Sequence, residues 1–163
     1  MSTKILIVSL AFLLSACGAV QHNLKLNEGY QPPADFKVAV GEVSYSGQYA
    51  DLEPQRRLRD ALAEAFRKKD LLAQGNSDKY LVLDSQILEY EPGNAFKRWM
   101  LPGWGATILS VRAVLRDGEK IAGTAEARRT ISIGGGYSIG AWKTIFPDVA
   151  EDVAEEIATK LKR

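Results

Sequence analysis

Apolar and polar residues alternate along four stretches of the chain, and this period of two predicts β-strands. The first stretch is short and rich in β-branched residues, and the second changes from an apolar run to alternation. The last two flank Asp117-Gly118, a dipeptide typical of a tight hairpin turn. The four expected strands span residues 37–43, 80–90, 107–116 and 121–133.

Two other stretches repeat their apolar residues every three or four positions, which is the period of an amphipathic helix. The first spans residues 54–72, with Pro54 well placed for the first helical turn. The second begins near Ala141 or Pro147 and continues to Lys162, so that Pro147 either opens the helix or lies inside a longer one. Its apolar stripe consists of Phe146, Val149, Ala150, Val153, Ala154, Ile157 and Leu161.

The predicted order of elements is therefore β-α-β-β-β-α. Strands joined by short turns pair antiparallel, and each helix needs an apolar surface to pack against. We expect an α+β fold, a two-layer sandwich with a mostly antiparallel sheet and two helices on one face.

Alternation in the strand at 121–133 separates an inner from an outer side. The side expected to face the helices carries Ile121, Ala125, Ala127, Ile131 and Ile133. Arg129 falls on this apolar side by parity. Its position predicts either a bulge there or an edge position for the strand.

The first residues have the layout of a secretory signal: the positive residue Lys4, an apolar run at 5–14, and small residues before Cys17. The run holds about ten residues, whereas a helix that spans a membrane needs about twenty. We therefore expect the run to be cleaved, not retained as a membrane span. Residues 18–35 show no sustained period and contain Pro32-Pro33. They predict a flexible tether or, alternatively, a segment that docks on the domain or on a partner.

The stretch Leu14-Ser15-Ala16-Cys17 resembles the lipobox of bacterial lipoproteins. The resemblance implies that Cys17 receives a diacylglycerol, that residues 1–16 are removed as a signal peptide, and that the new amine is acylated with a fatty acid such as palmitate. Gly18 stands where an aspartate often retains such proteins in the inner membrane, so the resemblance implies the periplasmic face of the outer membrane. We expect a lipidated cysteine and tether over 17–35 and one periplasmic domain over 36–163.

Charge and composition give little support to catalysis. The 21 Lys+Arg and 20 Asp+Glu nearly balance, so no strong field attracts nucleic acid. Cys17 is the only cysteine and His22 the only histidine, which leaves no His/Cys metal cluster. Asp84 and Glu89 lie in an expected strand and could face a cleft. Residues 134–140 are glycine-rich but lack the ending of a phosphate-binding loop. We expect no catalytic residue, no metal and no cofactor.

The stretch most informative for function is residues 96–105, between two expected strands. Two of the three tryptophans lie there, beside two basic residues. Either these apolar side chains fold back and cap the core, or they form an exposed patch for a partner or a membrane surface. Trp142 joins such a patch if the glycine-rich loop lies nearby. The candidate partner-binding residues are Lys97, Arg98, Trp99, Met100, Leu101 and Trp104.

Several of these features together resemble one uncharacterised family of proteobacterial lipoproteins, the domain of unknown function 4410. They are the lipobox, the Gly103-Trp104-Gly105 turn before a strand, the strand end from Arg112 to Asp117, and the glycine-rich loop before a C-terminal helix. The resemblance covers about residues 36–160 and implies no catalytic residues.

The sequence therefore predicts a lipid-anchored protein that is not an enzyme. We expect a non-catalytic protein-interaction module of the cell envelope, which binds another envelope protein. A small-ligand or lipid carrier is the alternative, with a cleft between sheet and helices lined by the aromatic loop. A cell-wall enzyme is the third hypothesis.

Overall fold

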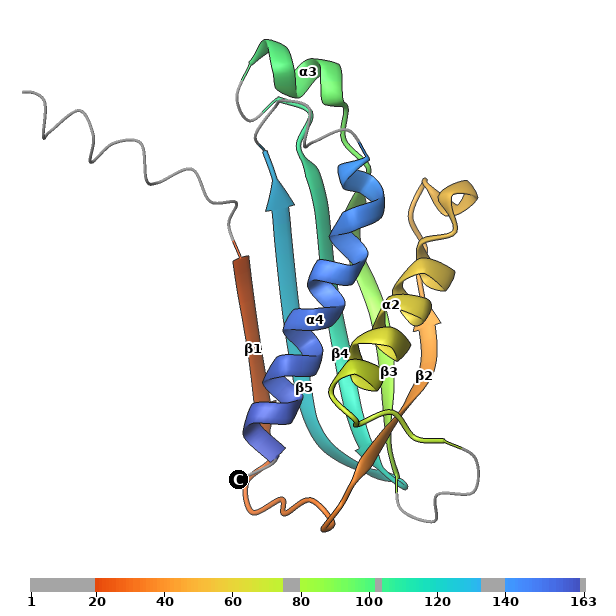
Figure 1. The fold of residues 1–163 in the computed structure, drawn as a ribbon, viewed down its shortest axis with the longest axis vertical. Helices are drawn as coiled ribbons and strands as arrows, with labels where there is room; N and C mark the ends of the chain where they lie inside the picture. Colours follow the sequence, from red (N-terminus) through yellow and green to blue (C-terminus); the bar gives the residue numbers. More distant parts are fainter. Residues whose placement is uncertain (1–19, 75–79, 102–103, 133–139, 162–163) are drawn as a thin grey trace, which may run out of the picture.

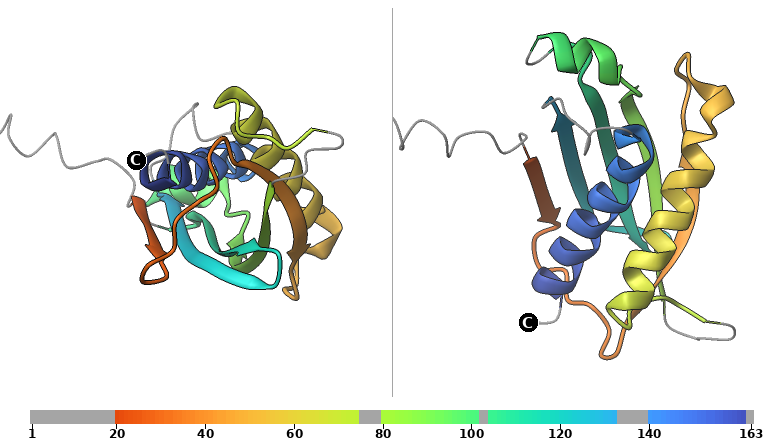
Figure 2. Two further views of the ribbon diagram at one scale, coloured as in Figure 1. Left: turned by 90° about the horizontal axis from the view of Figure 1, so that it is seen from below. Right: turned by 45° about the horizontal axis from the view of Figure 1, so that its top comes forward.

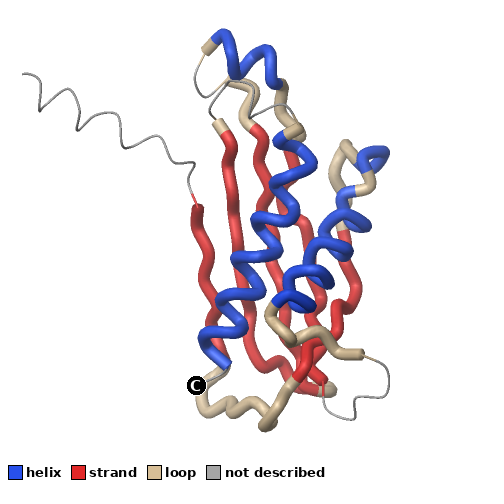
Figure 3. The backbone as a smooth tube through the Cα atoms, in the orientation of Figure 1, coloured by secondary structure: helices blue, strands red, loops and turns tan. Residues whose placement is uncertain are grey.

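A computed structural model of the protein describes residues 20–74, 80–101, 104–132 and 140–161. Five strands form one sheet in the order β1-β5-β4-β3-β2, and two long helices lie across one of its faces (Figures 1 and 3). The strands are β1 (Val20–Leu26), β2 (Lys37–Ser44), β3 (Tyr80–Glu91), β4 (Thr107–Asp117) and β5 (Lys120–Ile131). The helices are α2 (Pro54–Lys68), α3 (Ala95–Met100) and α4 (Ala141–Leu161), with a short 3-10 helix, η2, at Ala50–Leu52.

The expected α+β class is confirmed, but the expected order and sheet type are only partly right. The sheet is mixed, because β2 and β3 pair in parallel while the other neighbouring strands pair antiparallel. The parallel pair follows from α2, which lies between β2 and β3 in the sequence. A helical crossover returns the chain to the end of the sheet where it started, so the next strand runs in the same direction.

Strand β1 lies where the sequence predicted a flexible tether. Residues 20–26 pair with β5 from Val20 opposite Arg129 to Leu26 opposite Gly123. The tether prediction is therefore wrong for these seven residues, and the alternative that the segment docks on the domain is the one observed. The physical reason is apolar packing, because Leu24 is only 2% exposed beneath α4 and the partly buried Leu26 also packs against the core.

Helices α2 and α4 supply one layer of the core, and the inner face of the sheet supplies the other (Figure 2). The two helices contact each other, and α4 also packs on β5, β4 and β1. Close packing is possible because β5 presents the small side chains Ala125 and Ala127 to α4. Helix α4 begins at Ala141, so Pro147 lies inside the longer helix and does not open it.

A bulge changes the inward-facing set at the start of β5. The pairing register between β4 and β5 shifts between Leu115 and Arg116, which adds one residue to β5. Ala122 consequently points inward and is fully buried, whereas Ile121 is exposed. The prediction that Ile121 faces the helices is wrong for this reason, since one extra residue reverses the alternation. Ile133 lies outside the described residues.

Helix α3, like strand β1, is an element that the sequence did not predict. It is a short helix between β3 and β4 at one end of the sheet (Figure 1). The sequence predicted no helix there.

Among the described residues, no helix combines the length and the apolar character that crossing a membrane requires.

The packing of β1 predicts an effect of truncating its anchor. Leu24→Ala is expected to lower the free energy of unfolding by about 2–4 kcal/mol, because it leaves a cavity under α4. The exposed neighbour Lys25 provides a matched control, and Lys25→Ala is expected to change stability by less than about 0.5 kcal/mol. Chemical denaturation of both variants measures the difference. Equal, small effects would show that β1 does not pack on the domain.

Candidate functional site

Helix α3 and the turn after it expose a cluster of large apolar side chains at one end of the sheet. We call this cluster the α3 surface. The exposed fractions of its side chains are 66% for Phe96, 71% for Trp99, 53% for Met100, 58% for Leu101 and 48% for Trp104. The alternative in which residues 99–101 cap the core is therefore wrong, and the exposed patch is observed.

The helical period explains why these residues gather on one face. Phe96, Trp99 and Met100 are spaced at i, i+3 and i+4, which places them side by side on a helix. The ring centroids of Phe96 and Trp99 lie 6.1 Å apart. In most surface helices such a stripe faces the core. In α3 it faces away from the sheet, so the helix presents apolar area instead of burying it.

The backbone holds α3 in a defined position at the end of the sheet. The Asn94 side-chain oxygen accepts a hydrogen bond from the Lys97 backbone N–H at 3.1 Å, which caps the helix. The Asn94 backbone N–H donates to the Gly105 carbonyl at 2.9 Å and closes the loop. Gly105 has φ of +73°, and a Cβ there would lie 2.7 Å from the Lys97 Cβ. Only glycine fits this position without strain.

The α3 surface has basic neighbours and no acidic ones in its own segment. The Lys97 ammonium nitrogen lies 5.4 Å from the centroid of the Trp104 ring, within range of a cation–π interaction. Arg98 belongs to the same helix, but its side chain is outside the part of the chain that the structure describes. Residues 92–106 contain no aspartate or glutamate. The segment is therefore locally positive.

Trp142 makes a separate set of contacts at the start of α4. The Arg57 guanidinium carbon lies 4.9 Å and the Lys143 ammonium nitrogen 5.0 Å from the centroid of its ring. Its backbone carbonyl accepts a hydrogen bond from the Tyr90 hydroxyl at 3.3 Å. These contacts tie Trp142 to α2 and β3. The sequence predicted that Trp142 joins the aromatic patch if the glycine-rich loop lies nearby. The glycines at 134–136 of that loop lie outside the described residues, so this stays a prediction.

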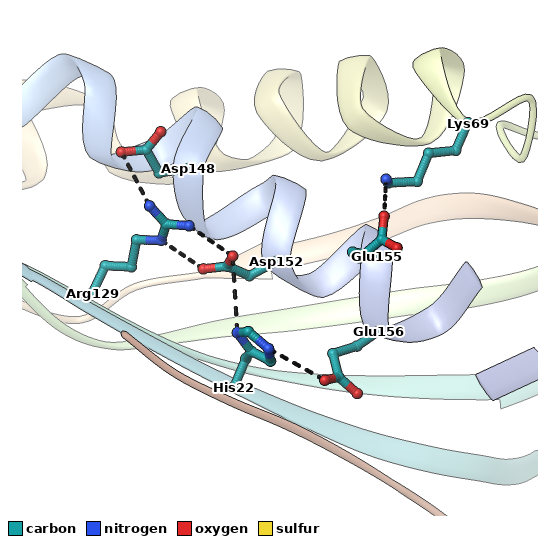
Figure 4. Close-up of polar contacts among 7 residues, drawn as sticks. All are labelled: His22, Lys69, Arg129, Asp148, Asp152, Glu155 and Glu156. Carbon is teal, nitrogen blue, oxygen red and sulfur yellow. Dashed lines mark hydrogen bonds and ion pairs between the residues drawn. The ribbon is translucent and has the colours of Figure 1, made fainter. Parts of the chain in front are cut away.

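A second constellation joins β1, β5 and α4 through ion pairs (Figure 4). Arg129 donates two hydrogen bonds to the Asp152 carboxylate, from Nε at 2.6 Å and from a terminal nitrogen at 2.8 Å. The Asp148 carboxylate lies 3.6 Å from the same guanidinium. His22 of β1 lies 3.9 Å from Asp152 and 3.4 Å from Glu156. We call these five residues the α4 polar cluster.

The α4 polar cluster explains the position of Arg129. The pairing of β5 is regular at Arg129, and β1 lies on its outer side, so both the expected bulge and the expected edge are wrong. Arg129 faces the helix because Asp152, which is 8% exposed, provides a buried countercharge. The sequence did carry a signal for an ion pair, since a charged residue such as Arg129 at an inward position requires a partner. The partner was not identifiable, because Asp152 lies on another element.

The electrostatics of the cluster follow from burial and pairing. The hydrogen bonds with Asp152 hold the pKa of Arg129 above its usual value. Burial raises the pKa of Asp148, and the charge of Arg129 opposes this rise. A raised folded-state pKa means that the folded protein binds this proton more tightly than the unfolded chain. The contribution of Asp148 to stability is therefore lost as pH rises through the raised pKa.

The strand carboxylates that were candidates for chemistry are also paired. Asp84 accepts a hydrogen bond from Arg116 at 2.9 Å and another from the Glu42 backbone N–H at 3.0 Å. Glu89 is bonded to Arg128. Both carboxylates lie on β3, and each pairs with an arginine: Asp84 with Arg116 of the adjacent strand β4, and Glu89 with Arg128 of β5. Across the described residues, no group of three or more His, Cys, Asp or Glu side chains is arranged to hold a metal ion.

A hollow lies at the opposite end of the sheet from α3. Its volume is about 820 Å³, and its lining includes Tyr30, Phe36, Lys37 and Lys160. Both lysines already donate hydrogen bonds to backbone carbonyls, Lys37 to Asp70 and Lys160 to Leu24. Burial, together with Asp117, raises the pKa of Tyr30 to about 12. The tyrosine is therefore a neutral hydrogen-bond donor at physiological pH.

The α4 polar cluster yields a stability prediction. Asp152→Ala leaves the Arg129 charge without its carboxylate, so we expect a loss of about 2–3 kcal/mol, below the cost for a fully buried pair. Glu155, in the same helix, pairs with Lys69 at the surface and provides the control. Glu155→Ala is expected to cost less than about 1 kcal/mol. Urea denaturation measures both values, and equal effects would show that Asp152 does not clamp β5 to α4.

Two solved structures of one other protein, PelC, share the fold of this chain. A single-substitution variant of PelC from Paraburkholderia phytofirmans, a dodecamer, is 15% identical with a TM-score of 0.57, covering 90% of this chain and 100% of its own. The PelC dodecamer in another crystal form is 17% identical with a TM-score of 0.51, covering 85% of this chain and 98% of its own. At these identities the likeness concerns the fold alone.

Two further comparisons concern the sequence itself. No curated protein matches the chain. The family described as "Domain of unknown function (DUF4410)" matches residues 47–135, which is more than half of the chain. The expected resemblance to this family is confirmed over this range, which includes the Gly103-Trp104-Gly105 turn and the strand end from Arg112 to Asp117. The lipobox lies outside the matched range. The chain belongs to the DUF4410 family.

Proposed function

We propose that this chain is a lipid-anchored protein of the bacterial cell envelope that works by binding and not by catalysis. The α3 surface carries the proposal. Five large apolar side chains are exposed on one short segment, although soluble domains usually leave such side chains exposed only singly. An apolar cluster that the backbone holds in place is typical of a surface that another molecule covers.

The anchor rests on the sequence around Cys17. A short apolar run ends in Leu14-Ser15-Ala16-Cys17, and no described helix could replace the lipid as an anchor. Three acyl chains hold a protein to a bilayer far more firmly than one, because each buried CH₂ contributes about 0.8 kcal/mol. Gly18, in the place of a retaining aspartate, favours the outer membrane.

The pairing of the carboxylates supports a role without catalysis. A general acid or base has to reach a substrate with a free oxygen. The carboxylates of Asp84, Glu89 and Asp152 are each bonded to an arginine instead. These pairs fasten strands and helix to one another, which is a structural role.

Association with other proteins is part of the proposal. PelC, which shares the fold, forms dodecamers, so copies of this chain are candidate partners along with other envelope proteins. Strands β1 and β2 form the two edges of the sheet, and the short segment around Leu72 pairs with β2 only at Val38. Edge strands are ready templates for pairing with another chain.

A carrier of small ligands is the second candidate function. The hollow at the far end of the sheet, at about 820 Å³, has the size of ligand sites. Its two lysines would suit an anionic ligand, but both are engaged in backbone hydrogen bonds. A ligand would have to displace these bonds, so the hollow supports the carrier less well than the α3 surface supports binding.

The anchor predicts the behaviour of a cysteine variant. Cys17→Ser removes the acceptor of the diacylglycerol, so metabolic labelling with a fatty acid is expected to be lost and the protein to leave the mature membrane fraction. Labelled, fractionated cells measure both effects. Normal membrane retention of an unlabelled Cys17→Ser protein would overturn the anchor.

The role of the α3 surface predicts a contact in living cells. A photoreactive residue that replaces Trp104 is expected to form adducts with another molecule, because this side chain is exposed within the apolar cluster. The same replacement at Glu119, in the turn at the far end of the sheet, is the control and is expected to form few. Mass spectrometry of the adducts identifies the partner as protein or lipid. A folded variant without adducts at position 104 would mean that the α3 surface is not where the protein binds.

A further inference from the structure

We propose that the α3 surface docks on the same membrane leaflet that holds the lipid of Cys17, as a second, non-covalent contact with the bilayer. The inference rests on the proposed function, in which Cys17 is lipidated and the α3 surface binds. It names the occupant of that surface: the interfacial region of a lipid bilayer.

The first argument is the position of α3 relative to the point where the chain leaves the anchor. Val20, the first residue of β1, pairs with Arg129, only two residues from the end of β5. The same end of the sheet carries Thr107, which pairs with Ile131 and starts the strand that follows α3. The chain therefore enters the domain at the α3 end (Figure 1).

The second argument is the length of chain between anchor and domain. Cys17 precedes Val20 by three residues, which span at most about 10 Å. A flexible coil over residues 18–35 would average about 25 Å and would allow every orientation. Since β1 pairs with β5, this freedom is lost. The α3 end of the sheet is then held next to the bilayer.

The third argument is the chemistry of the surface. Tryptophan is enriched at membrane–water interfaces, where its ring lies in the headgroup region. Trp99 and Trp104 are accompanied by the apolar side chains of Phe96 and Met100. Lys97, with a long side chain that reaches the headgroups, adds positive charge that suits anionic lipid.

The opposite end of the sheet shows a different character. Strand β4, of eleven residues, separates the two ends by about 35 Å. The turn there carries the charged residues Asp117, Glu119 and Lys120. An apolar segment with basic residues next to the anchor and a charged turn away from it match a domain that stands on the membrane in one orientation.

Tryptophan fluorescence tests the inference on the full mature, lipidated chain. The protein is reconstituted in vesicles of phosphatidylethanolamine and phosphatidylglycerol whose acyl chains carry bromine, which quenches tryptophan on contact. In a variant that keeps only Trp99, with Trp104→Phe and Trp142→Phe, we expect the vesicles to remove at least about half of the fluorescence, because interfacial side chains reach the acyl boundary. A matched variant carries Glu119→Trp and Phe at all three native positions, and is expected to lose little.

Two further measurements make the outcome decisive. Since Trp142 packs against Arg57, its replacement could disturb the fold. The single variant Trp99→Phe keeps Trp142, and its quenched fraction is expected to fall below that of the parent protein. Fatty-acid labelling of Cys17 is measured on the same samples.

The outcomes separate this inference from the proposed function. Strong quenching at Trp99 with little quenching at position 119 supports docking. Equal quenching at both positions, or none at Trp99 in labelled protein, overturns docking and leaves the lipid anchor standing. A protein adduct at position 104 in cells without quenching overturns docking and identifies a protein partner instead. Absence of lipid on Cys17 overturns the anchor and the inference together.

Discussion

The ion pair between Arg129 and Asp152 fastens the two layers of this protein at the point where β1 is added. The guanidinium extends from β5 and the carboxylate from α4, and two hydrogen bonds of 2.6 and 2.8 Å join them. His22 of β1 lies against the same carboxylate. A buried charge without a partner is costly, so the pair fixes how α4 lies on β5. That position in turn provides the surface on which β1 packs.

Strand β1 joins the N-terminal segment to the Arg129–Asp152 ion pair and to the core. It contributes Leu24 to the core, and its backbone carbonyl there accepts a hydrogen bond from Lys160 of α4 at 2.5 Å. The strand makes the N-terminal segment part of the domain and shortens the connection to Cys17. Under the proposed anchoring, the orientation of the domain relative to the membrane depends on contacts inside the fold and not on the length of a linker.

Charge and apolar area are divided between different regions. The carboxylates of Asp84, Glu89 and Asp152 are bonded to arginines and stabilise the fold. The exposed apolar area gathers on α3 and the turn after it, where the segment holds no acidic residue. Gly105 allows this loop to approach Lys97 closely, because any side chain at this position would collide with Lys97. This division is the basis on which we propose recognition by apolar contact.

The sequence by itself determined the α+β class, the approximate extents of four strands and two long helices, and the family. These features depend on local periodicity and on turn residues such as Asp117-Gly118, which act over a few residues. The candidate residues of the aromatic loop were also found from the sequence, because tryptophans beside basic residues stand out in any loop.

Only the tertiary structure decided the role of residues 20–26, the partner of Arg129 and the direction in which Trp99 points. Each depends on elements far apart in the chain: β1 needs the open edge of β5, and Arg129 needs Asp152. Trp99 has the helical spacing of a core residue, but α3 lies beyond the end of the sheet, where no layer covers it. Periodicity states that a side of an element is apolar, whereas the packing of the other elements decides whether that side is buried.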